Sequence, residues 1–120
     1  MEQPAGNKIT GNPSSHPALS VKWVEDFPDI PLNRNEAYKL RVTSKGVEIE
    51  AITETGVYRA IQTLRQLTEK KGNGIAITGC EITDWPAFRI RGFMQDVGRT
   101  YISTDELKRE IAILARYKIN

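Results

Sequence analysis

The chain has 120 residues, which is enough for one small domain with its own core. Seventeen Lys and Arg against fifteen Asp and Glu give a net charge of +2 with both signs interspersed, which argues against nucleic acid as the main partner. One cysteine, Cys80, excludes an internal disulfide, and with the single His16 it makes no zinc-type cluster. No apolar run is long enough to span a membrane, so we expect no membrane span.

Residues 1–17 are rich in Gly, Pro, Asn and Ser, which predicts a mobile tail. They lack the basic-then-apolar pattern of a secretory signal. In the next stretch, "ALSVKWV" (18–24), apolar residues occupy alternate positions. This spacing predicts a half-buried strand with Leu19, Val21 and Trp23 on its inner face.

Residues 37–52 carry the clearest pattern in the chain, two alternating runs joined by a turn. The first run, 37–44, sets apolar Tyr38, Leu40 and Val42 against polar neighbours. The second run, 47–52, does the same, with Glu48 and Glu50 on its polar side. Lys45 and Gly46 supply the turn, where Gly tolerates a positive φ. The pattern predicts an antiparallel hairpin with a solvated charge ladder on its polar face.

The following residues change to a helical period. Apolar residues fall on one stripe of a helix that starts after an N-cap at Thr53, runs through Lys70 and Lys71, and closes at Gly72 or Gly74. The members of the stripe are Val57, Ala60, Ile61, Leu64 and Leu67. We expect this stripe to pack across the apolar face of the hairpin.

The last third of the chain reads as short strands and then one strand and one helix. Residues 75–85 predict one or two short strands broken at Gly79, and residues 88–99 predict a further strand. "STDE" at 103–106 matches a capping box for an amphipathic helix that runs toward Asn120. A strand followed by a helix is half of a crossover unit, which needs a parallel neighbouring strand. We therefore expect the end of the chain to be the first step of a larger α/β domain.

Three segments, taken together, resemble the family 20 glycoside hydrolases, the β-N-acetylhexosaminidases. "EAYKLRVTSKGVEIEA" is similar to the family's hairpin, and "TGVYRAIQTLRQL" to the helix after it, with its Gly-x-x-x-Ala-x-x-Thr-Leu-x-Gln-Leu pattern. "ITDWPAFRIRGFMQDVGR" with "ISTDELKREIAILARYKIN" looks like the junction and the first unit of the catalytic barrel. Two positions depart from the family pattern, Gln95 in place of an aliphatic residue and Thr100 in place of a histidine.

The resemblance implies a fold and a division of the chain. The fold class is α+β, a small antiparallel or mixed sheet covered by an amphipathic helix. After the tail, residues 18–85 would form the non-catalytic N-terminal domain. Residues 86–120 would form a truncated first β/α unit of a TIM barrel, whose active site lies at the C-terminal ends of its strands.

The resemblance also implies one substrate-binding residue. Arg99 matches the arginine that holds hydroxyls of the terminal sugar, and Asp96 is its expected orienter. The residues alone favour a different interpretation, in which Arg99 is a surface arginine at a strand end, paired with Asp96. Arg91 is expected to be structural, because its five donors need acceptors.

The expected function is hydrolysis of terminal N-acetylhexosamine from glycans by substrate-assisted catalysis, without metal or cofactor. The family's catalytic Asp-Glu pair would lie on a later strand, so no catalytic residue is expected in this chain and the chain alone should be inactive. The family is typically secreted, periplasmic or lysosomal. The alternative is a stand-alone α+β carbohydrate-binding or interaction module. We also expect self-association through an exposed C-terminal helix.

Overall fold

The computed structural model describes residues 8–9 and 18–120. The chain divides into two compact units, Met1–Ala87 and Phe88–Asn120. Most of the expected tail, including His16, lies outside the described residues. Within it, Lys8–Ile9 form a short strand, β1, which pairs with residues farther along the first unit.

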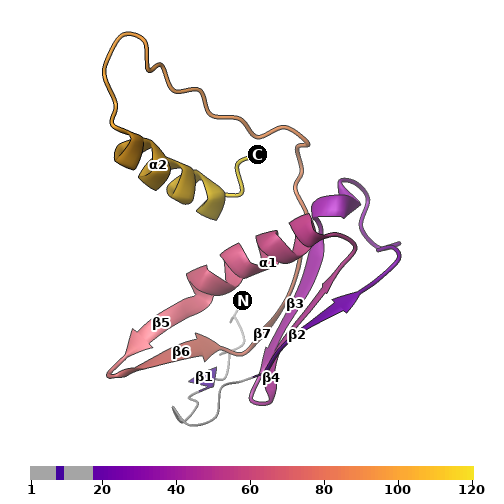
Figure 1. Ribbon diagram of the computed structural model, residues 1–120. Coiled ribbons are helices and arrows are strands. Elements are labelled where there is room, and N and C mark those ends of the chain that lie inside the picture. Colours follow the sequence, from indigo (N-terminus) through magenta and orange to yellow (C-terminus); the bar gives the residue numbers. More distant parts are fainter. Residues whose placement is uncertain (1–7, 10–17) are drawn as a thin grey trace, which may run out of the picture. The chain divides into compact units, whose positions relative to one another are not determined.

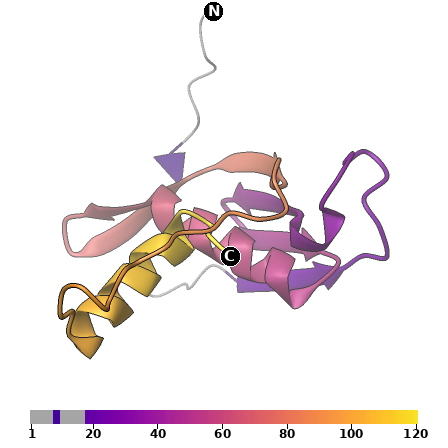
Figure 2. The same ribbon diagram turned by 90° about the horizontal axis from the view of Figure 1, so that it is seen from above.

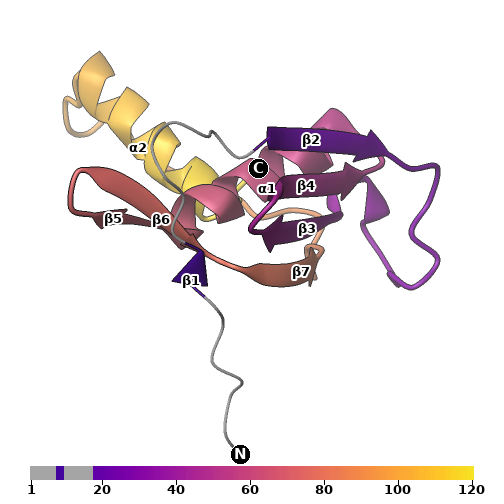
Figure 3. The same ribbon diagram turned by 90° about the horizontal axis from the view of Figure 1, so that it is seen from below.

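The first unit contains a mixed four-stranded sheet, with its strands in the order β2-β4-β3-β7 (Figure 3). The strands are β2 (Ala18–Trp23), β3 (Tyr38–Thr43), β4 (Gly46–Ala51) and β7 (Cys80–Asp84). β2 runs parallel to β4, whereas β3 is antiparallel to both of its neighbours. The expected α+β class with a mixed sheet is confirmed.

The predicted hairpin is present with the predicted inner face. Leu40 lies opposite Ile49 and Val42 opposite Val47, and all four side chains are buried. The hairpin also forms the centre of the core, where Cys80 is half-buried. Gly46 has φ 149° and a Cβ there would lie 2.4 Å from the carbonyl oxygen of Ala18, so glycine is needed where β2 approaches.

Helix α1 (Glu54–Leu67) packs across β3 and β4, as Figures 1 and 2 show. The Thr53 side chain caps it by accepting a hydrogen bond from the Gly56 N–H at 3.3 Å, as the sequence predicted. Ala60 is fully buried, and the rest of the stripe is half-buried against the same core: Val57, Ile61, Leu64 and Leu67. Burial of this apolar stripe, more than helix propensity, stabilises the helix.

The predicted C-terminal end of this helix was wrong. α1 stops at Leu67, and Thr68–Lys71 form a strand, β5, which pairs with β6 (Gly74–Thr78). Gly72, at φ 59°, begins the two-residue turn between them. β1 completes a second sheet, in the order β1-β6-β5. Backbone pairing with β6 supplies the hydrogen bonds that a last helical turn would have made.

The predicted half-burial of the 18–24 strand was also wrong, although the strand itself is present. All six residues of β2 are exposed. Leu19, Val21 and Trp23 pair with buried residues of β4 and so lie on the same face of the sheet, yet they are 54%, 39% and 58% exposed. β2 is an edge strand, and the helix that covers that face packs on β3 and β4.

Two polar clusters hold α1. One lies where the helix meets the sheet, and the other where it meets the segment before β3. The Tyr38 hydroxyl lies 2.5 Å from the Thr63 hydroxyl and donates to Asp84 Oδ2 at 2.8 Å. Arg59 Nε donates to Glu36 at 3.0 Å, and both side chains are largely buried. A buried charge needs such a partner, so these contacts fix the helix relative to its neighbours.

The second unit contains helix α2 (Thr104–Arg116) and an extended segment before it. The capping box is confirmed, because Ser103 Oγ accepts from the Glu106 N–H at 3.2 Å and Glu106 accepts from the Ser103 N–H at 2.9 Å. The strand predicted over 88–99 is not formed. A strand requires a hydrogen-bonded neighbouring strand, and residues 117–120 beside the segment are too few to form one.

Candidate functional site

Asp96 and Arg99, the two residues expected to form the sugar site, lie together in a tight turn. Asp96 Oδ1 accepts hydrogen bonds from the backbone N–H groups of Gly98, at 2.8 Å, and Arg99, at 3.3 Å. Asp96 Oδ2 lies 3.3 Å from Arg99 Nε. One carboxylate therefore holds both the backbone of the turn and the inner nitrogen of the guanidinium group.

The Arg99 side chain is 92% exposed. A guanidinium group has five N–H donors in a fixed plane, and its Nε is turned toward Asp96. The two terminal nitrogens can then donate in parallel to a pair of neighbouring oxygens. An exposed ion pair of this kind contributes little to stability.

Arg91, which was expected to be structural, is held within the second unit by backbone acceptors. Its Nε donates to the Lys118 carbonyl oxygen at 2.7 Å and one terminal nitrogen donates to the Phe88 carbonyl oxygen at 2.7 Å. Asn120, which no sequence motif indicated, makes three hydrogen bonds to Arg89 and Arg91. An Asn after the end of a helix was the one available signal.

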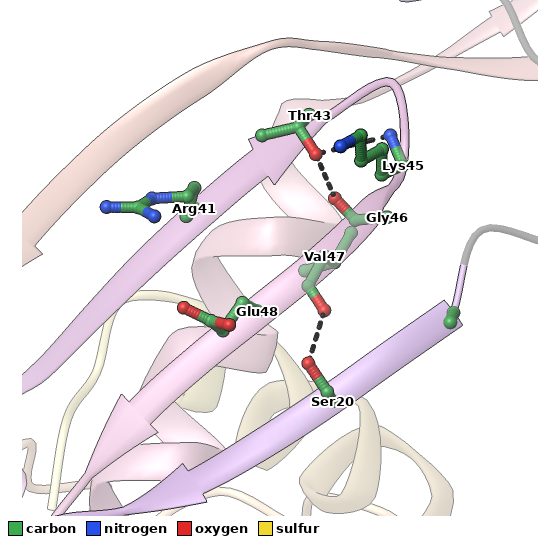
Figure 4. A pocket seen from close by; sticks show the side chains of 8 residues that line it. Ser20, Arg41, Thr43, Lys45, Gly46, Val47 and Glu48 are labelled. Atoms are coloured by element: carbon green, nitrogen blue, oxygen red, sulfur yellow. Dashed lines mark hydrogen bonds between the residues drawn. The ribbon is translucent and has the colours of Figure 1, made fainter.

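A shallow groove on the polar face of the first unit is lined in part by side chains that already contact other protein groups (Figure 4). Its two hydroxyl groups already donate to backbone carbonyl oxygens, Thr43 to Gly46 at 3.3 Å and Ser20 to Val47 at 3.5 Å. Arg41, also in this groove, pairs with Glu81 at 2.7 Å. The two hydroxyl groups and the Arg41 side chain therefore already have partners within the protein.

The expected charge ladder is present on this face, with partners from the flanking strands and loop. Lys39 faces Glu50 and Arg41 faces Glu48 in the hairpin register. The close ion pairs, however, are Lys22 with Glu50 at 2.6 Å and Lys39 with Asp29 at 2.9 Å. The hydrogen bond from Lys39 lowers the pKa of Asp29, and the hydrogen bond to Glu50 raises the pKa of Lys22. Both are solvated pairs and indicate no acid-base site.

Residues 8–9 and 18–120 contain no group of three or more His, Cys, Asp and Glu side chains arranged to hold a metal ion. In the same residues, neither helix has the length and apolar character needed to cross a bilayer. Burial raises the pKa of the Cys80 thiol, which is the behaviour of a packed cysteine. The Asp96 and Arg99 turn is the best candidate for a binding site.

An α+β domain with a mixed sheet and a single covering helix is the class of structure that the first unit defines. The sequence profile of glycosyl hydrolase family 20, domain 2, matches residues 4–85. The chain therefore belongs to glycosyl hydrolase family 20, as the resemblance predicted.

Two curated relatives of the chain are named as hexosaminidases. The chain is 38% identical to a β-N-acetylhexosaminidase of Cellulomonas fimi over 104 residues, which are 86% of this chain and 21% of that protein. It is also 38% identical to a β-hexosaminidase of Porphyromonas gingivalis, over 99% of this chain and 14% of that protein. The chain thus spans about a fifth or less of the length of these two relatives.

Solved structures agree with the sequence relatives. The crystal structure of a β-N-acetylhexosaminidase from Bacteroides fragilis superposes with a TM-score of 0.74 at 34% identity, over 89% of this chain and 20% of that one. A family 20 exo-β-N-acetylglucosaminidase from Vibrio harveyi, in complex with N-acetylglucosamine, gives a TM-score of 0.70 at 34% identity. It matches 85% of this chain and 15% of its own.

Proposed function

We propose that this chain is part of a β-N-acetylhexosaminidase, an enzyme that removes terminal N-acetyl-D-hexosamine from glycans. The observation that carries the proposal is the alignment of 86% and 99% of the chain, each at 38% identity, with two hexosaminidases. The N-acetylglucosamine complex of the Vibrio harveyi relative supports this class of sugar.

The chemistry of this family is substrate-assisted. The acetamido oxygen of the sugar attacks the anomeric carbon, in place of a carboxylate nucleophile of the enzyme, and configuration is retained. A glutamic acid protonates the leaving oxygen while an aspartate positions the acetamido group. We assign both carboxylates to a part of the enzyme outside this chain, and the mechanism needs no metal or organic cofactor.

We assign residues 18–85 to the non-catalytic domain and residues 86–120 to the first β/α unit of a catalytic barrel. The structural match to the Bacteroides fragilis enzyme covers 89% of the chain. The first unit contains 87 of the 120 residues, so the match includes part of the second unit. The Asn120 N–H also donates to the Arg91 carbonyl oxygen at 3.0 Å. This contact supports the assignment, because the strand that follows a crossover helix pairs in parallel beside the strand before it.

Within this unit, Arg99 is proposed to bind hydroxyl groups of the terminal sugar and Asp96 to orient it. The turn that holds both residues follows the extended segment, and in catalytic barrels the loops after strands carry the ligand contacts. Two parallel N–H donors on a planar fork match two adjacent hydroxyl groups of a pyranose ring.

The first test is hydrolysis of a chromogenic N-acetylglucosaminide. We expect the longer protein that contains this chain to turn it over and residues 1–120 alone to be inactive, since general acid catalysis alone is worth about 10²–10⁴-fold. Both proteins must be free of host hexosaminidase. Activity of the isolated chain would contradict the assignment of the catalytic pair. An inactive longer protein would favour the stand-alone binding module.

The second test is Arg99→Lys in the longer protein. A lysine ammonium reproduces the planar fork poorly, and hydrogen bonds to a charged group are worth about 1.5–3 kcal/mol each. We expect kcat/KM to fall by roughly tenfold or more. In the isolated chain the melting temperature should barely change, because the side chain is 92% exposed. Unchanged kcat/KM would contradict a role in substrate binding, and a large loss of stability would show that Arg99 is structural.

A further inference from the structure

Arg91 and Asn120 fasten the extended segment of the second unit to the end of α2. Asn120 uses its backbone N–H toward the Arg91 carbonyl oxygen at 3.0 Å and its side-chain oxygen toward the Arg91 N–H at 2.8 Å. Its side-chain nitrogen donates to the Arg89 carbonyl oxygen at 2.9 Å. Three polar groups of one residue thus bind three backbone groups of the segment, one on Arg89 and two on Arg91.

The Arg91 side chain makes the reverse connection. Its guanidinium group donates to the Lys118 carbonyl oxygen, just past the end of α2, and to the Phe88 carbonyl oxygen, each at 2.7 Å. The last carbonyl groups of a helix lack partners within the helix, and an arginine is well suited to bind in this region. Each of the two residues therefore holds the backbone at or near the other residue, and we call this set of contacts the lock.

The backbone after α2 is shaped to bring Asn120 into this position. The Lys118 N–H donates to the Ala115 carbonyl oxygen at 3.0 Å and the Ile119 N–H donates to the Leu114 carbonyl oxygen at 3.1 Å. This is the Schellman pattern, and its left-handed residue is Lys118, at φ 59°, where glycine is the usual choice. A left-handed lysine persists where the surrounding contacts fix it.

The lock matters for the site because the segment it holds leads directly to the Asp96 and Arg99 turn. The segment forms no strand, so its position depends on the contacts that hold its ends. Arg91 is five residues before Asp96. Loss of the contacts at Arg91 would therefore release the residues that lead to Asp96 and displace the turn that holds Arg99.

We propose that Arg91 and Asn120 are positioning residues for the sugar site, which act by holding in place the segment that carries Asp96 and Arg99. This proposal rests on the proposed function of Arg99. It assigns to Asn120 a role in substrate affinity, although Asn120 itself need not touch the sugar.

The experiment measures kcat and KM of the longer protein with a chromogenic N-acetylglucosaminide. Asn120→Ala should raise KM by about tenfold, since a small misplacement of a binding group can cost up to about 10²-fold in rate. Asn120→Asp retains the acceptor for the Arg91 N–H and loses the donor to Arg89. Its KM should therefore lie between the KM of the unmodified protein and that of the Asn120→Ala variant. Asn73→Ala, in the turn between β5 and β6, is the matched control and should leave both constants unchanged.

The decisive arm is a double variant. If Asn120 acts through Arg99, then Asn120→Ala should add little further loss once Arg99→Ala has removed the side chain it positions. Additive losses, or an Asn120→Ala enzyme with unchanged KM, would overturn the proposal while leaving the proposed function intact. An Asn120→Ala protein that has lost activity through unfolding would be revealed by its circular dichroism, and the folded Asn120→Asp variant then decides through its own KM and double variant. Absence of hydrolysis by the unmodified longer protein would overturn both.

Discussion

Gly56, in the first turn of α1, lies where the helix comes closest to the segment before β3. A Cβ at this position would lie 2.5 Å from the Ala37 carbonyl oxygen and 3.1 Å from the Ala51 Cβ. In an open helix position Gly→Ala stabilises by up to about 1 kcal/mol. We expect Gly56→Ala to destabilise instead, by about 1–3 kcal/mol, because the backbone must move to relieve the overlap.

Thermal unfolding followed by circular dichroism measures this effect, at roughly 4–8 °C per kcal/mol for a domain of 60–100 residues. Gly74→Ala is the control, since its nearest neighbour beyond the adjacent residues is the Lys71 carbonyl oxygen at 3.8 Å. A Gly56→Ala protein as stable as the parent would mean that α1 moves away from the sheet at little cost.

Lys118, also at the residue scale, is a lysine in a conformation that favours glycine. Its φ of 59° costs about 1–2 kcal/mol for a residue with a Cβ. Glycine removes that cost but gives the unfolded chain more freedom, so Lys118→Gly should stabilise by about 0.5–1 kcal/mol. The same substitution at exposed Lys108, within α2, should destabilise by about 1 kcal/mol. Amide exchange in α2 measures both changes in stability. If the two substitutions changed the stability in the same direction, the prediction would be wrong.

At the scale of the element, the N-terminus of α2 is held by a titratable group. Hydrogen bonds from the Ser103 side chain, at 2.6 Å, and backbone lower the pKa of Glu106 below its ordinary value of 4.5. A carboxyl group whose folded pKa is lowered stabilises the folded form above its unfolded pKa. That contribution is lost as the pH falls from about 4.5 through the lower, folded pKa.

We therefore expect the first turn of α2 to lose amide protection on acidification through this range. The measurement is hydrogen exchange at residues 104–107, corrected for intrinsic exchange rates, between pH 6 and pH 3. Glu106→Gln keeps a side chain that can complete a capping box and removes the titration, so its protection should be flat with pH. A variant with the same pH profile as the parent would assign the effect to another carboxylate.

The elements also differ in how their apolar faces are covered. α1 has its stripe packed on β3 and β4, whereas β2 exposes Leu19, Val21 and Trp23. An edge strand with an exposed apolar face and few charges is a site where sheets associate. Helix α2 has no buried residue, and Ile111 and Tyr117 are 65% and 76% exposed.

At the scale of the whole molecule, these exposed faces predict concentration-dependent self-association. We expect the C-terminal helix to contribute, so that Ile111→Lys lowers the association measured by sedimentation velocity. Each apolar side chain removed from water is worth about 1.5–3 kcal/mol. Lys108→Glu, on the same helix, is a control for charge. If only Val21→Lys lowers association, the edge of the sheet is the interface and the expectation for α2 is wrong.

The sequence by itself determined the features that depend on neighbours along the chain. Strict alternation defined both faces of the 38–51 hairpin and hence its register, since a slip of one residue would expose Leu40 and Ile49. The caps at Thr53 and Ser103 were equally readable, because a cap is a contact over three residues. The Asp96 and Arg99 pair lies at the same short range.

Only the tertiary structure decided the contacts that join distant segments. Thr68–Lys71 form a strand because β6 offers backbone partners, which no local pattern reveals. Lys22 pairs with Glu50 because β2 lies parallel to β4, and the same placement at the edge of the sheet exposes Trp23. Arg91 and Asn120 lie 29 positions apart, and the left-handed turn at Lys118 brings them together. Such contacts depend on chain direction in space, which residue order alone does not specify.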